Sequence, residues 1–393
     1  MRQFFFFLSF LFSFLVANSQ IQTLWDESYG GEADDEANSI SILSDGNLLA
    51  IGYTESQGEG KKDGYMMKLN REGEMQWEMT YGGAKDDILY DVIELNGNKL
   101  AAVGYTESQG AGGRDYWLIV TDKDGTLLWE KTYGGQKDDE AVQVTMATDG
   151  KLVITGNTKS RGAGSYDIWS IKIDQDGQGK DLGKELWKRN VGGNSADFTG
   201  EVIENKKDSM QVIVGTTNSF GNGSGDVFII KLSEEAGQIK GKKTLGSKVY
   251  DYGYGFVITN ENGYFIVGAS LGSSNNGLFD GWAIRINNDF DSYFEKTLGG
   301  KKEDAFKAVA KHKEQFLIAG HTESEGEGKA DGWLVLMDKD GNILMDETIG
   351  EQGNDQFFRI ISSPTGEYYL CGSTDSKGEG KKDIWVVKIK MDK

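Results

Sequence analysis

Apolar and polar residues alternate along short stretches of this chain, and glycine-containing turns separate the stretches. In the first complete copy of the pattern, the alternation predicts four strands, at 38–43, 47–54, 64–69 and 75–81. Asp45-Gly46 and Glu72-Gly73 fall between strands, where glycine supplies the positive φ that a tight hairpin turn needs. The 3.6-residue apolar spacing of amphipathic helices is absent, so we expect an all-β protein.

The four-strand pattern occurs seven times. Each copy carries a glycine-containing anchor such as Tyr-Gly-Gly, and successive anchors are 51 to 58 residues apart. The anchors begin at Tyr29, Tyr81, Tyr133, Val191, Leu245, Leu298 and Ile349. A period near 50 residues with four short strands is typical of a propeller blade. The sequence therefore predicts a seven-bladed β-propeller of four-stranded antiparallel blades, built by residues 20–393 as one domain.

The two ends of the repeat region complement each other. The last copy ends after its third strand, at 385–390, and an unaccompanied fourth strand at 24–29 precedes the first copy. Together these pieces make one complete blade, and pairing them removes the strand edges that an open ring would expose. We expect the N-terminal strand to close the ring by pairing into the last blade.

Residues 1–19 have the features of a signal peptide. Arg2 precedes an apolar run at 4–16, and Ala17 and Ser19 are the small residues that a signal peptidase reads. The run is too short to anchor the chain comfortably across a bilayer, and no later segment is apolar enough to span one. We expect cleavage before Gln20 and export to the periplasm or the cell exterior.

Composition excludes several classes of function. With 62 acidic and 42 basic residues, the formal net charge of −20 argues against nucleic-acid binding, which needs a basic stripe. Cys371 is the only cysteine, so no internal disulfide can form, and its apolar neighbours predict a buried, unreactive thiol. The two histidines, His312 and His321, are not part of a zinc motif, and no serine lies in a Gly-x-Ser-x-Gly elbow.

Several positions keep their residue type in every copy, among them a glycine at the end of the second strand. One aspartate follows the anchor: Asp35, Asp87, Asp139, Asp197, Asp251, Asp304 and Asp355. A second aspartate opens the third strand: Asp63, Asp115, Asp167, Asp226, Asp280, Asp331 and Asp383. Two residues later stands an aromatic: Tyr65, Trp117, Trp169, Phe228, Trp282, Trp333 and Trp385. We expect the aromatics to wedge between blades and the carboxylates to accept N–H groups from the glycine loops. The alternative for the aspartates is a metal-binding ring, for which calcium is the suitable ion; no other cofactor is indicated.

These motifs resemble a known family. The order Gly-x-Thr-x-Ser, glycine loop, Asp-x-Trp-x-x-Lys, Asp-x-x-Gly and Trp-x-x-x-Tyr-Gly-Gly is similar to the seven-bladed β-propeller repeat (SBBP-like) family of exported bacterial proteins. The likeness covers 25–390 and is weakest in the fifth copy, which has Gly241 at the position of tryptophan. The resemblance implies the fold and export, and it implies no defined reaction.

Positions that differ between copies are the candidates for function. After the repeated glycine of the second strand, the varying residues include Tyr53, Tyr105, Asn157 and His321. Four residues after the first aspartate, charged groups occur as Asp91, Glu201 and Arg359. Near a central channel, these charged groups would form a polar site. The alternative is neutral variation at solvated positions.

Two functions fit this pattern. The first is an exported, non-enzymatic, monomeric binding scaffold that presents a broad face to a protein or a glycan. The second is a polysaccharide-acting enzyme, a glycosidase or lyase, that uses channel carboxylates as acid and base. A deep pocket with two converging carboxylates would favour the enzyme, and a shallow, nearly seven-fold face would favour the scaffold.

Overall fold

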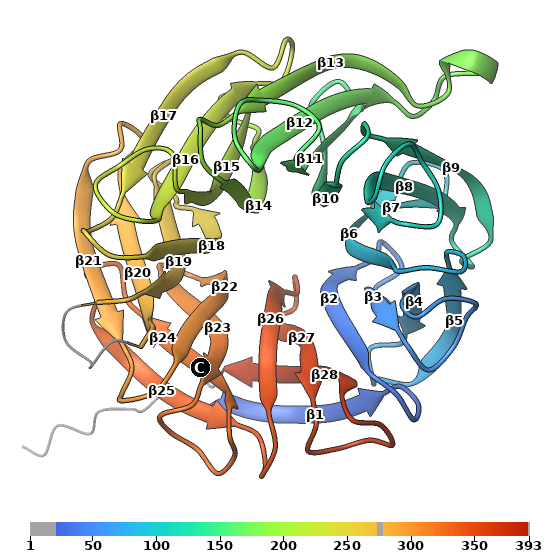
Figure 1. Cartoon of the computed structure of the whole chain (residues 1–393). Helices are drawn as coiled ribbons and strands as arrows, with labels where there is room; N and C mark the ends of the chain where they lie inside the picture. The colour runs from blue at the N-terminus through green and yellow to red at the C-terminus, as the bar shows by residue number, and fades with distance from the viewer. Residues whose placement is uncertain (1–20, 273–277, 392–393) are drawn as a thin grey trace, which may run out of the picture.

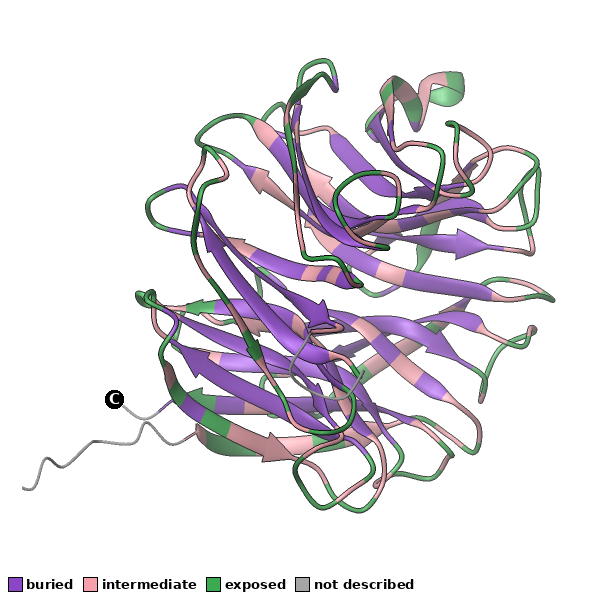
Figure 2. Ribbon diagram, turned by 60° about the vertical axis from the view of Figure 1, so that its left-hand side comes forward, coloured by how far each residue is buried: buried purple, intermediate pink, exposed green. Residues whose placement is uncertain are grey.

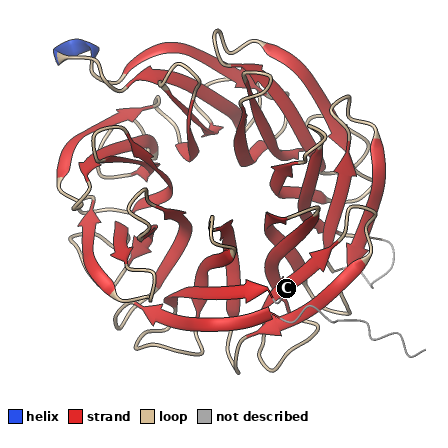
Figure 3. Ribbon diagram, turned by 180° about the vertical axis from the view of Figure 1, so that it is seen from behind, coloured by secondary structure: helices blue, strands red, loops and turns tan. Residues whose placement is uncertain are grey.

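The computed structural model describes residues 21–272 and 278–391 of the chain. Within these ranges, seven four-stranded antiparallel sheets stand around a central channel (Figure 1). The predicted seven-bladed fold is confirmed. Strands make up almost all of the ring, and one 3₁₀ turn, η1 (Gly179–Asp181), projects from its outer side (Figure 3). The predicted signal peptide at 1–19 lies outside the described residues.

Each blade runs from an inner strand at the channel to an outer strand at the rim. The inner strands are β2 (Asp35–Ile42), β6 (Asp87–Leu95), β10 (Asp139–Met146), β14 (Asp197–Asn205), β18 (Asp251–Ile258), β22 (Asp304–His312) and β26 (Asp355–Ser362). The second strands are β3 (Leu48–Thr54), β7 (Lys99–Thr106), β11 (Leu152–Thr158), β15 (Met210–Thr217), β19 (Tyr264–Ser270), β23 (Gln315–Thr322) and β27 (Glu367–Thr374).

The remaining two strands complete each sheet. The third strands are β4 (Asp63–Leu69), β8 (Asp115–Asp122), β12 (Asp167–Asp174), β16 (Asp226–Ser233), β20 (Asp280–Ile286), β24 (Asp331–Met337) and β28 (Asp383–Met391). The outer strands are β5 (Met75–Tyr81), β9 (Leu127–Tyr133), β13 (Lys184–Val191), β17 (Ile239–Leu245), β21 (Ser292–Leu298), β25 (Ile343–Ile349) and β1 (Ile21–Tyr29). Blades are numbered one to seven in the order of their inner strands, from β2 to β26.

The middle strands of each blade form the core. All seven residues of β3 and of β4 are buried, whereas in the outer strand β5 only Tyr81 is buried and the others are exposed or half-buried (Figure 2). A strand covered on both faces reads as a continuous apolar run, and a half-covered one alternates. In the part of the chain that the structure describes, no helix is long and apolar enough to cross a membrane.

The repeated aromatic residues join neighbouring blades, as predicted. Trp117 of blade two is 1 % exposed and shares a core cluster with Met66 of blade one. Within its own blade, Trp385 stacks on Phe357 with ring centroids 4.4 Å apart, and it shares a core cluster with Leu334 of blade six. Trp333 likewise stacks on Phe306 of its own blade at 4.6 Å and clusters with Phe265 of blade five. Burying each large side chain stabilises the ring by about 1.5–3 kcal/mol. The chain has a single cysteine, Cys371, which is buried and cannot form an internal disulfide. The ring is therefore stabilised by packing of this kind and not by disulfides.

The N-terminal strand closes the ring. β1 pairs with β28 from Ile21, opposite Met391, to Tyr29, opposite Ile384. The first and last segments of the chain therefore share blade seven (Figure 1). β1 also reaches blade one, because the Tyr29 hydroxyl donates to the Gly73 carbonyl at 2.5 Å. The predicted closure is confirmed.

The repeated aspartates hold the loops at one end of the blades. Asp139 Oδ2 accepts the Gly135 N–H at 2.8 Å, and its Oδ1 accepts the Thr158 hydroxyl. The second aspartates act similarly, since Asp63 accepts the Gly60 N–H at 2.8 Å. This confirms the predicted hydrogen bonds to the loops. Among the described residues, no group of three His, Cys, Asp or Glu side chains is placed to hold a metal ion.

Asp139→Ala is expected to lower the free energy of unfolding by about 1–3 kcal/mol, because the substitution leaves loop donors without an acceptor. Urea unfolding measures the change, and calorimetric titration with calcium provides the second readout. An Asp139→Ala protein of unchanged stability that has lost calcium binding would instead support the metal ring.

Candidate functional site

A β-bulge in every inner strand shapes the wall of the channel. The pairing register shifts between the third and fifth residues of each inner strand, as between Leu89 and Asp91. The skipped fourth residue and the residue after it lie opposite one residue of the second strand. All seven skipped residues line one cavity of about 160 Å³: Asn38, Tyr90, Val142, Gly200, Tyr254, Lys307 and Phe358.

Three of the residues that follow the bulges tie their blade to the next one. Asp91 Oδ2 accepts the Val144 N–H at 3.1 Å, and Glu201 Oε2 accepts the Phe256 N–H at 2.7 Å. Gln143 Oε1 accepts the Val202 N–H at 2.6 Å. These backbone donors belong to the neighbouring inner strand in each case. The predicted channel residues Asp91 and Glu201 therefore have a structural role between blades.

Arg359 connects opposite sides of the ring. Its Nη1 donates to Glu201 Oε1 at 2.6 Å, although blade seven and blade four are not neighbours. The Glu201 side chain is 8 % exposed and that of Arg359 is 26 % exposed. Asp91 lies close enough for Arg359 to affect its ionisation. The structure thus brings the three predicted charged residues together in the channel.

Burial raises the pKa of Asp91 to about 6, although Arg359 favours the charged form. The carboxyl group therefore holds its proton more tightly in the folded chain than in the unfolded chain. Consequently, this group makes stability decrease as the pH rises from about 4 through about 6. Asp91→Asn removes that decrease. The difference in free energy of unfolding, variant minus wild type, should therefore rise by up to about 3 kcal/mol between pH 4 and pH 7. Urea unfolding of both proteins at several pH values measures this difference. Stability curves of the two proteins that run parallel with pH would contradict the expectation.

A row of tyrosines runs along β18 into the cavity. Tyr250 and Tyr252 have ring centroids 6.2 Å apart and planes 17° from parallel. Tyr252 and Tyr254 follow at 5.8 Å and 11°. Tyr250 is 39 % exposed, and Tyr254 lines the cavity. The row therefore leads from the surface to the centre of the channel.

Lys307 lies where this row ends. Its Nζ is 4.0 Å from the ring centroid of Tyr254, a cation–π contact. Burial lowers the pKa of Lys307 to about 8, against the opposing effect of Glu303. Among the described residues, no hydrogen bond or ion pair joins its ammonium group. The cavity thus combines aromatic rings with one cation that no carboxylate of the described residues contacts directly.

The other predicted site residues are buried. Tyr53 and Tyr105 are 7 % and 3 % exposed and share one cluster, against which Tyr90 packs. Asn157 accepts the Thr199 N–H of blade four at 2.8 Å. His321 is buried, its Nδ1 has no hydrogen-bond partner among the described residues, and burial lowers its pKa to about 4. The tyrosine pair approaches the cavity through Tyr90, and His321 lies close enough to the cavity residue Lys307 for that cation to add to the lowering of its pKa by burial.

Sequence reasoning missed the skipped residues, including Tyr254 and Lys307. Simple strand alternation selects one residue in two and does not allow for a bulge. A signal was nevertheless present, because the fourth position of the inner strand carries a different chemistry in most copies. Asn38, Val142 and Lys307 illustrate that variety.

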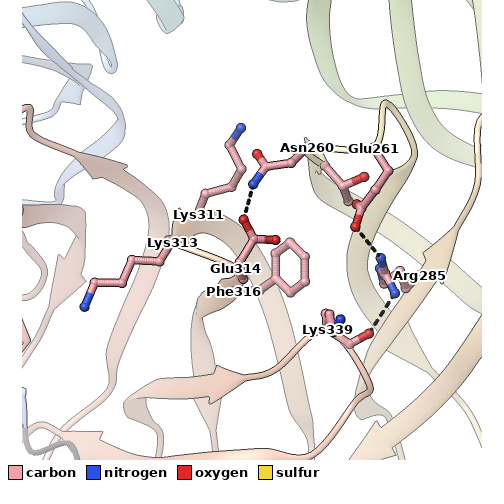
Figure 4. A pocket seen from close by; sticks show the side chains of 9 residues that line it. Asn260, Glu261, Arg285, Lys311, Lys313, Glu314, Phe316 and Lys339 are labelled. Atoms are coloured by element: carbon pink, nitrogen blue, oxygen red, sulfur yellow. Dashed lines mark hydrogen bonds and ion pairs between the residues drawn. The ribbon is translucent and has the colours of Figure 1, made fainter.

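A second hollow between blades five and six is too small for an organic ligand. It holds about 10 Å³, about the space for one water molecule. Arg285 in this hollow lies 3.4 Å from Glu261 and donates to the Lys339 carbonyl (Figure 4). The channel cavity is therefore the better candidate site.

No family model matches the chain. Regulatory protein FlaEY of Caulobacter vibrioides is 22 % identical over 202 residues, which is 45 % of this chain and 21 % of that protein. The chain thus spans about a fifth of the length of this curated relative.

Solved structures share the fold at low sequence identity. The Pan2 WD40 domain of Neurospora crassa has a TM-score of 0.57 at 10 % identity, over 94 % of this chain and 96 % of that one. The WD40 β-propeller domain of Doa1 has a TM-score of 0.56 at 9 % identity, over 95 % and 98 %. A protein of unknown function from Dyadobacter fermentans has a TM-score of 0.50 at 11 % identity, over 95 % and 99 %. These likenesses support the β-propeller fold.

Proposed function

We propose that this chain is an exported, non-enzymatic binding propeller of the SBBP-like type, which holds a glycan at the mouth of its central channel. Export, to the periplasm or the cell exterior, rests on the signal-peptide features of residues 1–19. A monomer suffices for this role, because one ring provides the whole channel. A protein ligand at the same face is the alternative if no oligosaccharide binds.

The row of Tyr250, Tyr252 and Tyr254 leading into the cavity carries the proposal. A sugar ring has an apolar C–H face that packs on aromatic rings, while its hydroxyls need polar partners. The cavity supplies such partners through Asn38 and Gln143. Its volume of about 160 Å³ is below the 300–1,000 Å³ typical of whole-ligand pockets, so it suits the end of a chain whose remainder follows the tyrosines.

One observation favours the enzymatic alternative. Asp91 lines the cavity with a pKa raised by burial to about 6, which is suitable for a general acid. The carboxylates are otherwise engaged, however: Asp91 accepts from Ser39 and Val144, and Glu201 is paired with Arg359. We therefore favour binding over hydrolysis.

Titration of the chain from Gln20 onward with neutral and acidic oligosaccharides, with and without calcium, tests the proposal. Tyr252→Ala should weaken binding of the best oligosaccharide about tenfold, or about 1.4 kcal/mol, because it interrupts the row. Tyr293→Ala is the matched control, since Tyr293 belongs to the same blade but is 59 % exposed on the outer strand β21.

Equal losses in the two variants, or no oligosaccharide bound under either condition, would contradict the glycan proposal. Cleavage of a bound polysaccharide that disappears in Asp91→Asn without a loss of affinity would establish the enzyme instead.

A further inference from the structure

Among the described residues, the charged groups that line the channel cavity have hydrogen-bond or ion-pair partners except at one residue. Arg359 is paired with Glu201 at 2.6 Å. Asp91 accepts the Ser39 hydroxyl and the Val144 N–H, both at 3.1 Å. Within the described part of the chain, Lys307 is the charged residue of the cavity lining that has no polar partner.

We propose that the glycan is acidic, and that the carboxylate of a uronic acid unit pairs with the Lys307 ammonium group while the sugar rings pack along the tyrosines. This inference rests on the proposed function and specifies its ligand. Tyr254 fixes the geometry, because the Lys307 Nζ lies 4.0 Å from its ring centroid. A sugar ring placed on the tyrosine row therefore brings its substituents to the ammonium group.

The energetics favour an anionic group at this point. An ammonium group that is partly removed from water and lacks an anionic partner is unfavourable, and the lowered pKa of Lys307 reflects this cost. A carboxylate from the ligand would supply the missing partner through a charge-assisted hydrogen bond. One lysine matches one singly charged acid, whereas a densely charged anion would meet the carboxylates of Asp91 and Glu201.

The overall charge of the protein makes the local cation necessary. A net charge of −20 repels an anionic chain at long range. That repulsion is screened beyond about 8 Å at physiological ionic strength. Recognition of an acidic sugar must therefore come from groups in direct contact with it, and Lys307 is placed for that contact.

The test compares a hexamer of galacturonic acid with its methyl ester, which has the same rings without the charges. Wild-type protein should bind the acid at least tenfold more tightly than the ester. Lys307→Met should remove this difference while leaving ester binding, and Lys307→Arg should keep most of it. Lys242→Met is the matched control. Lys242 belongs to the outer strand β17, its Nζ lies 4.7 Å from the ring centroid of Phe220, and its loss changes the net charge of the protein equally.

The outcomes separate this inference from the proposed function. If acid and ester bind equally and Tyr252→Ala weakens both, the glycan function stands and the role of Lys307 is wrong. Discrimination that persists in a folded Lys307→Met protein also overturns that role. If neither hexamer binds, and neutral oligosaccharides also fail, both proposals are wrong. Tighter binding of hexaglutamate than of the uronate, dependent on Lys307, would overturn the choice of a sugar.

Discussion

Deletion of residues 20–29 is expected to abolish cooperative unfolding and to convert the monomer into aggregates. The deletion removes β1 and exposes the edge of β28 along its whole length. It also removes Trp25 and Tyr29, which pack against the core cluster of Ile384 and Val386. The lost packing amounts to several kcal/mol, a large part of the stability of a typical protein. Size-exclusion chromatography and urea unfolding measure both effects.

A synthetic peptide of residues 20–29, added in trans, provides the control. If the open edge of β28 is the cause, the peptide should restore the monomer and raise the melting temperature with its concentration. A truncated chain that stays monomeric and melts like wild type would show that β1 is dispensable for closure.

The second large effect is expected at the cross-channel ion pair. Arg359→Met should lower the free energy of unfolding by about 2–3 kcal/mol, because it leaves Glu201 charged in a site where that side chain is 8 % exposed. The expected loss is smaller than for a fully buried ion pair, because the Arg359 side chain is 26 % exposed. The coupling energy between Arg359→Met and Glu201→Gln, from a double-mutant cycle, should be about 1–3 kcal/mol.

Lys188→Met tests whether any lost ion pair has this effect. Lys188 pairs with Glu185 on the surface at 3.2 Å, so its loss should change stability by less than about 1 kcal/mol. Additive effects of Arg359→Met and Glu201→Gln would mean that the pair does not connect the two sides of the ring.

The sequence by itself determined the blades and their closure. Each blade is a local unit of four strands, so one copy of the pattern, with its turns at pairs such as Asp45-Gly46, specifies its own sheet. Closure followed from counting the strands of each copy. An extra fourth strand, which contains Trp25, precedes the first copy, and the last copy lacks a fourth strand of its own. The buried state of Cys371 followed in the same way from its apolar strand. Local pairing and burial are readable along the chain because their partners are close in sequence.

The candidate site was predicted in part. Asp91, Glu201 and Arg359 stood out because they break the repeat, and they do meet in the channel. Their partners were not readable, since 158 residues separate Arg359 from Glu201 and only the closed ring places them opposite each other. The bulges determined the other cavity residues. Each bulge skips one residue of an inner strand, and the skipped residues Tyr254 and Lys307 line the cavity. A bulge depends on how neighbouring strands pair and twist in the assembled ring, so only the tertiary structure decided that the skipped residues line the channel.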